Sequence, residues 1–113
     1  MTTEELLQQI YDAADDLKAE NIETLDVRSK TSIADYFVVC TGTSDRHVQS
    51  IAERVEERLT VHRVKPLRIE GERSGWIIQD YGEVVLHVMR EEQRQFYDLE
   101  TLWKNAKPSL DLP

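Results

Sequence analysis

A junction between a predicted strand and a predicted helix, at Thr41–Ser44, has the residue types that could hold a phosphate. Backbone N–H groups and hydroxyls gather where a helix begins, and this segment reads Thr-Gly-Thr-Ser. It lacks the glycine spacing and the lysine of a P-loop, and it lacks the three glycines of a dinucleotide fingerprint. A tight turn followed by a helix cap at Ser44 explains these residues better. We therefore predict no nucleotide site and no cofactor.

Other residues that could do chemistry are scattered along the chain. A metal centre could be assembled from Asp35, Asp45, Asp80 and His87, but no two carboxylates stand one residue apart on a strand, as in the Asp-x-Asp pairs of nucleotidyl transfer. Cys40 lies inside an apolar run, where a thiol is more often an inert filler than a nucleophile, and no serine stands in a nucleophile elbow. The sequence therefore predicts no metal site and no catalysis.

The composition is that of a single folded domain with an acidic surface. Its 113 residues include 14 Lys and Arg against 22 Asp and Glu, for a formal net charge of −8. That charge repels a phosphate backbone, so nucleic-acid contact should be at most incidental, whereas a basic protein partner is compatible with it. No apolar run approaches the roughly 20 residues of a membrane span. Because Met1–Glu5 also lacks the basic start of a secretion signal and the lone cysteine can form no internal disulfide, we expect no membrane contact and a cytoplasmic location.

Two apolar runs within Gly75–Met89 meet at a tight turn around Tyr81 and Gly82, and we expect them to form the central hairpin. The second run is apolar at nearly every position, so both of its faces should be covered. A charged turn is expected to follow it, up to Phe96. Periodicity and capping residues predict the remaining elements: a helix capped at Thr2 and running to about Glu20, strands at Ile22–Val27, Tyr36–Thr41 and Val64–Glu70, a helix capped at Ser44 with its apolar stripe between Val48 and Leu59, and a last helix capped at Asp98 and reaching Ala106.

These elements predict an α/β (α+β) fold: a single-domain, mixed five-stranded sheet with helices mainly on one face. Two long helices cover about one face of such a sheet, which leaves the other face to the short C-terminal helix. The last two strands are nevertheless apolar on both sides, so we expect a partly open face. It should present some of the following side chains, although the alternative is that they pack beneath the last helix: Trp76, Ile78, Tyr81, His87 and Met89.

Four blocks of the sequence, in this order and spacing, resemble the ribosomal silencing factor family, also called the RsfS or Iojap family. The blocks are Asp35–Val48, Glu70–Trp76, Asp80–His87 and Phe96–Trp103. The resemblance spans almost the whole chain. It predicts one ribosomal silencing factor domain over residues 1–107, followed by a C-terminal tail at 108–113.

The resemblance implies a factor without enzymatic activity that binds the large ribosomal subunit at the protein L-fourteen and sterically prevents the small subunit from joining. Translation would thereby be repressed under nutrient limitation. It also implies a nucleotidyltransferase-like fold without its active site, and the missing Asp-x-Asp pair agrees with that loss. The alternative is a nucleotide-binding or nucleotidyltransferase-like enzyme, which would need a carboxylate pair beside Gly42. A homodimer formed through the open sheet face is also compatible with the sequence.

The docking residues are expected among the aromatic and charged side chains of the matching blocks. Desolvated aromatic side chains supply most of the energy of protein interfaces, and charged neighbours steer and orient the partner. We predict Trp76 and Tyr81 as anchors, with polar contacts from Glu70, Asp80 and His87.

Overall fold

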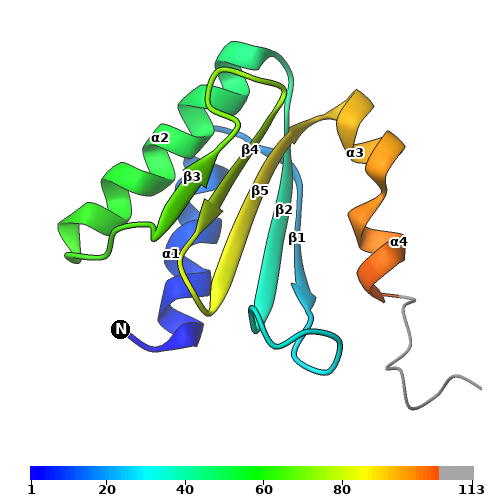
Figure 1. The fold of residues 1–113 in the computed structure, drawn as a ribbon. Coiled ribbons are helices and arrows are strands. Elements are labelled where there is room, and N and C mark those ends of the chain that lie inside the picture. The colour runs from blue at the N-terminus through cyan, green and yellow to red at the C-terminus, as the bar shows by residue number, and fades with distance from the viewer. Residues whose placement is uncertain (105–113) are drawn as a thin grey trace, which may run out of the picture.

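The computed structural model describes residues 1–104, so the predicted tail at 108–113, the domain boundary at 107 and the expected helical position Ala106 lie outside the described residues. The described part forms one sheet and four helices (Figure 1). In chain order the elements are α1 (Thr3–Asp16), β1 (Glu20–Asp26), β2 (Tyr36–Gly42), α2 (Asp45–Val61), β3 (Arg68–Glu70), β4 (Trp76–Asp80), β5 (Val84–Arg90), α3 (Glu91–Tyr97) and α4 (Leu99–Lys104).

The five strands are ordered β1-β2-β5-β4-β3. β2 and β5 run parallel, with Val39 opposite His87, and the other three neighbouring pairs are antiparallel. The predicted mixed five-stranded sheet is therefore confirmed. β5 occupies its centre because its hairpin with β4 inserts beside β2 rather than extending the sheet from β1.

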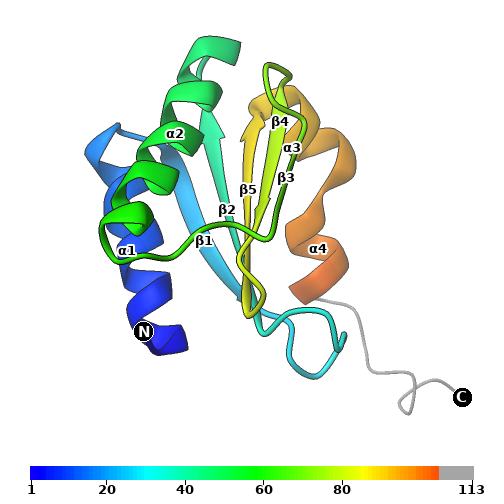
Figure 2. The ribbon, with the colours of Figure 1, turned by 60° about the vertical axis from the view of Figure 1, so that its left-hand side comes forward.

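Helices cover both faces of the sheet to different extents (Figures 1 and 2). The two long helices, α1 and α2, pack side by side against one face. On the other face α3 contacts β5 and β2, while α4 contacts β1. The part of this second face that belongs to β4 and β3 is therefore less covered, and the expectation of helices mainly on one face is confirmed.

The hairpin strand β5 contributes to two separate cores, as its unbroken apolar sequence predicts. Val84, Leu86 and Val88 point into the core beneath α1 and α2. Val85 and Met89 point into a smaller core on the opposite face, which is closed by Leu99 and Trp103 of α4 and also contains Leu25, Val27 and Phe37. Because successive side chains of β5 point to opposite faces of the sheet, this strand contributes to the cores on both faces.

Local capping interactions fix where the helices begin. At α1, Thr2 Oγ1 accepts from the backbone N–H of Glu5 at 3.1 Å, and the Glu5 carboxylate accepts from the Thr2 N–H at 2.9 Å. At α2, Ser44 Oγ accepts from the N–H of His47 at 3.0 Å. The caps predicted at Thr2 and Ser44 are confirmed. α1 ends at Asp16, before the predicted Glu20, because Lys18 takes a left-handed conformation with φ 59°.

Two predicted segments differ from the structure. The strand expected over Val64–Glu70 is reduced to β3, since Pro66 lacks an N–H and only Leu67 continues the pairing, with its N–H donating to the Asp80 carbonyl at 2.7 Å. The charged turn expected before Phe96 is instead the helix α3. Its inward-facing residue is Arg94, so it shows no apolar periodicity in the sequence.

Within residues 1–104, no helix combines the length and the apolar character that crossing a membrane requires.

Candidate functional site

The less covered face of β3, β4 and β5 brings together most of the residues predicted to bind a partner. Pairing places Glu70 opposite Ile78 and Ile78 opposite His87, so these three side chains form a row across the strands. Trp76 and Asp80 lie two residues before and after Ile78 on β4 and share its face. We call this surface the docking face, defined by Arg68, Glu70, Trp76, Ile78 and Asp80, with the buried His87 beneath Trp76.

Trp76 is the aromatic centre of the docking face. Its side chain is half-buried, and its indole N–H donates to His87 Nδ1 at 3.1 Å. The indole also packs against the Tyr97 ring of α3, with ring centroids 4.8 Å apart. The hydrogen bond and the ring contact hold the indole in place while part of it stays accessible, which suits an interface anchor.

His87 lies beneath Trp76 and is only 7% exposed. Its ring is 5.0 Å from the Phe37 ring, centroid to centroid. Burial lowers the pKa of His87 to about 4, so the ring is neutral at physiological pH. Because Nδ1 accepts the indole N–H, the ring proton is assigned to Nε2, which has no hydrogen-bond partner in the described part of the chain. His87 therefore supports Trp76 from below rather than lying on the surface.

The two apolar neighbours of Trp76 on this face differ in exposure. Ile78 is half-buried and packs against the core that α4 closes, while Met89 is fully buried in that core. Met89 therefore follows the alternative stated above, in which it packs beneath the last helix, and not the open-face arrangement. α3 and α4 cover the β5 end of this face, which puts Met89 beneath them.

Carboxylates border the docking face. The Asp80 carboxylate lies 3.6 Å from the Arg68 guanidinium and accepts from the Gly82 N–H at 2.8 Å, where Gly82 has φ 89°. Asp80 therefore stabilises the tight turn between β4 and β5 that the sequence predicts. Glu70 is exposed on the edge strand β3. Both carboxylates place negative charge at this border, and Asp80 in addition stabilises the turn.

Tyr81 does not lie on the docking face, which corrects the expectation that an open face presents it. The residue is 6% exposed and belongs to the core beneath α1 and α2. Its hydroxyl donates to Gln79 Oε1 at 2.8 Å, and the Gln79 amide donates to the Ala52 carbonyl of α2 at 2.9 Å. Strand alternation is the reason: Ile77, Gln79 and Tyr81 point to the helices, while Trp76 points away. Burial also raises the pKa of Tyr81.

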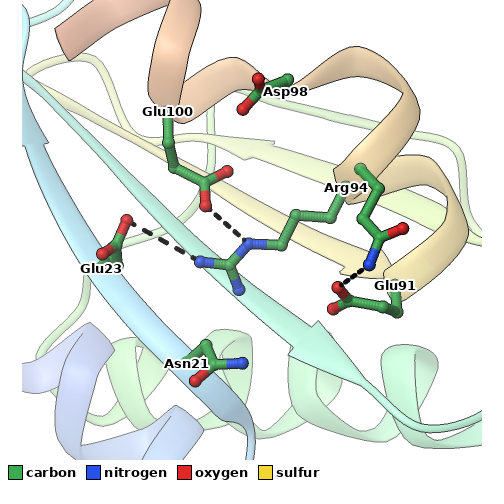
Figure 3. Close-up of a pocket in the computed structure, with 7 residues that line it drawn as sticks. Asn21, Glu23, Glu91, Arg94, Asp98 and Glu100 are labelled. Atoms are coloured by element: carbon green, nitrogen blue, oxygen red, sulfur yellow. Dashed lines mark hydrogen bonds and ion pairs between the residues drawn. The ribbon is translucent and has the colours of Figure 1, made fainter.

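Arg94 of α3 was not predicted as a functional or structural residue, because no motif or periodicity in the sequence marks it. It is 6% exposed and donates to Thr41 Oγ1 at 2.8 Å and to the Glu100 carboxylate at 3.0 Å. Figure 3 shows its guanidinium reaching between Glu100 and Glu23, within a polar hollow of about 270 Å³. These bonds attach α3 to β2 and α4, and so fix the helix that carries Tyr97 against Trp76.

Comparison with known proteins assigns the fold and the sequence to one family. The family model described as "Ribosomal silencing factor during starvation" matches residues 1–113. The chain belongs to the ribosomal silencing factor family. The resemblance inferred from the four sequence blocks is therefore confirmed.

Two bacterial members of the silencing factor family match this chain over nearly their full length. The ribosomal silencing factor RsfS of Halalkalibacterium halodurans is 38% identical over 113 residues, which cover 99% of this chain and 96% of that protein. RsfS of Bacillus subtilis is 36% identical, with 99% and 95% covered. A crystal structure of a Chromobacterium violaceum protein superposes with a TM-score of 0.89 at 35% identity and covers 100% of this chain and 95% of that one.

In this silencing factor, the strand-to-helix junction uses its hydrogen-bond donors within the chain. The Thr43 backbone N–H donates to His47 Nδ1 at 2.9 Å, and His47 Nε2 lies 2.7 Å from the Leu17 carbonyl of the α1 cap. Ser44 Oγ accepts from the His47 N–H, as described above. The imidazole thus accepts from the Thr43 N–H at this junction, and it joins α2 to the end of α1.

Cys40 is buried in the centre of β2 in this silencing factor. Burial raises the pKa of its thiol to about 12, so the thiol stays protonated at neutral pH. In addition, the described residues contain no group of three His, Cys, Asp or Glu side chains that could hold a metal ion. Neither a thiolate nucleophile nor a metal cluster is formed in this part of the chain.

The buried His87 should make the silencing factor sensitive to acid. Its folded-state pKa of about 4 lies below the ordinary value of 6.5, so the unfolded chain binds the proton more tightly. This group leaves stability unchanged above pH 6.5 and lowers it as the pH falls from 6.5 to about 4. At pH 5 the expected loss of unfolding free energy is about 2 kcal/mol relative to pH 7.

Urea denaturation of wild type and His87→Gln at pH 7 and pH 5 measures this loss. Glutamine can still accept from the Trp76 indole but does not titrate, so the variant should lose about 2 kcal/mol less than wild type between the two pH values. An identical pH dependence for both proteins would show that His87 is not the acid-sensitive group.

Proposed function

We propose that this chain is a translation repressor that binds the large ribosomal subunit through the protein L-fourteen and sterically prevents the small subunit from joining. Membership of the ribosomal silencing factor family over the full chain is the observation that carries the proposal. Two relatives named ribosomal silencing factor, from Halalkalibacterium halodurans and Bacillus subtilis, match over more than nine-tenths of their length. The proposed role is regulatory rather than enzymatic, it belongs to the cytoplasm, and nutrient limitation is its expected setting.

The docking face has the chemistry that suits a basic ribosomal protein. Trp76 and Ile78 supply apolar area that a partner can desolvate, and Tyr97 extends it onto α3. Glu70 and Asp80 border this area, and the chain has a formal net charge of −8. Attraction between such a face and a positively charged partner accelerates association and fixes its orientation. Nucleic-acid contact is expected to be incidental because the same charge repels RNA.

The proposed mechanism is occlusion. A protein domain seated on L-fourteen would occupy space that the small subunit needs, so no chemical step is required. The factor should therefore bind free large subunits and not ribosomes that have already joined.

Light scattering of purified bacterial ribosomal subunits tests this proposal. With the protein added before the small subunit, the joined fraction should fall with dose. With the protein added after joining, the scattering should not change. Unaltered joining in the first arrangement would refute the silencing mechanism, and disassembly in the second would refute simple occlusion.

The acidic border provides a charge test of the same face. Replacing Glu70 with Lys and Asp80 with Asn should slow binding to large subunits about tenfold at low salt, because a basic partner loses its attraction. Asparagine keeps the side-chain oxygen that accepts from the Gly82 N–H, so the turn should persist. Stopped-flow measurements at several salt concentrations give the association rate.

A matched control makes the same charge change elsewhere. Glu57→Lys with Asp15→Asn alters two exposed carboxylates of α2 and α1, on the opposite side of the sheet. This protein should associate nearly as fast as wild type. Equal slowing by both double variants would mean that net charge acts without a specific face.

A further inference from the structure

α3 exposes two aromatic side chains that the sheet does not need for its core. Phe96 is 80% exposed and Tyr97 is 50% exposed, while the buried residue of this helix is Arg94. The Phe96 ring meets the Tyr97 ring edge-on with centroids 4.9 Å apart, and Tyr97 in turn packs on Trp76. A continuous row of aromatic rings therefore runs from the docking face outward onto α3.

The outer end of this row borders a surface hollow of about 350 Å³. Its lining consists of Glu92, Gln93, Phe96 and Tyr97. Glu92 is exposed and its carboxylate lies 3.5 Å from the Arg90 guanidinium at the start of the helix. Gln93 Oε1 is buried and has no hydrogen-bond partner among the described residues. The lining thus combines two aromatic rings with an exposed carboxylate, while the buried amide of Gln93 forms its floor.

The position of this hollow is set by the surrounding fold. Gln93 lies directly against Gly75, where an added Cβ would come within 2.7 Å of the Gln93 amide nitrogen. Arg94, on the next position, binds Thr41 and Glu100 as described above. α3 is therefore attached to β2 and α4 and packs closely on the residue before β4, with Tyr97 against Trp76.

We propose that this hollow receives an arginine side chain of the basic partner. A guanidinium stacks on aromatic rings such as those of Phe96 and Tyr97 and pairs with a neighbouring carboxylate such as that of Glu92. Lysine fits less well because its ammonium is strongly hydrated and not planar. A nucleobase could also stack on Phe96, but the phosphate beside it would meet Glu92 and an acidic protein. The inference rests on the proposed function and names one contact within it.

Substitutions at Phe96 separate stacking of a cation from plain apolar contact. Phe96→Ala should weaken the binding of purified large ribosomal subunits about tenfold, and Phe96→Leu should lose nearly as much because leucine keeps apolar bulk without a ring. Glu92→Gln should weaken binding about threefold and reduce its salt dependence. The control Val61→Ala removes a side chain of α2 that is 77% exposed, and it should bind as wild type does.

The measurement is the dissociation constant for large subunits, with protein-free large-subunit RNA as a second probe and circular dichroism to check folding. Phe96→Leu binding like wild type would overturn the arginine contact. Binding of free RNA that depends on Phe96 would instead indicate base stacking, and self-association that depends on Phe96 would indicate a second copy of the chain. If wild type binds and Trp76→Ala does not, while both Phe96 variants bind normally, this inference alone fails. If wild type does not bind subunits, the proposed function fails as well.

Discussion

Replacing Trp76 with Ala is expected to weaken binding to the large ribosomal subunit by about 3 kcal/mol, a loss of more than a hundredfold. The indole is half-buried at the centre of the docking face, between His87 and Tyr97. Truncation removes the largest apolar surface there and leaves His87 Nδ1 without its donor. Sedimentation with purified large subunits, at several protein concentrations, measures the effect.

Trp103→Ala is the matched control for this substitution. Trp103 packs edge-on against Phe37, with ring centroids 5.1 Å apart, in the core that α4 closes. Its loss should lower stability while leaving most of the binding intact. A folded Trp76→Ala protein that binds normally would contradict the proposed docking face. An unfolded one would show that Trp76 serves the core instead.

Removing the Arg94 side chain is expected to have the largest effect on stability. Arg94→Ala should lower the unfolding free energy by about 4 kcal/mol, because it leaves the Thr41 hydroxyl and the Glu100 carboxylate without their buried partner. Urea denaturation measures the loss. Since α3 carries the aromatic pair beside Trp76, the folded fraction of this variant should also bind large subunits more weakly.

Two further variants make this prediction specific. Arg90→Ala removes a more exposed arginine that pairs with Asp45 and Glu92, and it should cost no more than about 1 kcal/mol. Combining Arg94→Ala with Glu100→Ala should cost less than the sum of the single changes, because the orphaned carboxylate is removed as well. Additive losses would mean that the two side chains do not stabilise each other.

The elements that the sequence predicted well are those whose burial is apolar and periodic. The stripe of α2 from Val48 to Leu59 is buried as predicted, and β5 is covered on both faces. Capping side chains at Thr2 and Ser44 located the helix starts because their hydrogen bonds are local. Such features depend on neighbours within a few residues, which a single sequence displays.

Features that depend on distant contacts were not predictable in the same way. The inward residue of α3 is Arg94. It stabilises the fold through hydrogen bonds to Thr41 and Glu100, which lie on other elements. The parallel pairing of β2 with β5 likewise joins strands separated by α2, β3 and β4. Neither the hydrogen bonds of Arg94 nor the order of the strands in the sheet produces a periodic pattern in the sequence.

The candidate site was predictable in part. Glu70, Trp76, Asp80 and His87 fall on one face because β-strand alternation and register place them there. The same alternation, counted from Trp76, puts Tyr81 on the opposite face, so its burial could have been deduced once the hairpin was accepted. The exposure of Phe96 could not have been deduced, because it depends on the packing of α3, a helix that the sequence analysis did not predict.

The deep position of Cys40 has a practical consequence for following this protein on the ribosome. It is the single cysteine of the chain, and a buried, protonated thiol reacts slowly with maleimide reagents. A cysteine introduced at the exposed Val61, away from the docking face, would therefore take up a fluorophore with little background labelling. Because Cys40 itself takes up little label, the fluorescence of such a variant would report almost entirely on the introduced cysteine during binding and release.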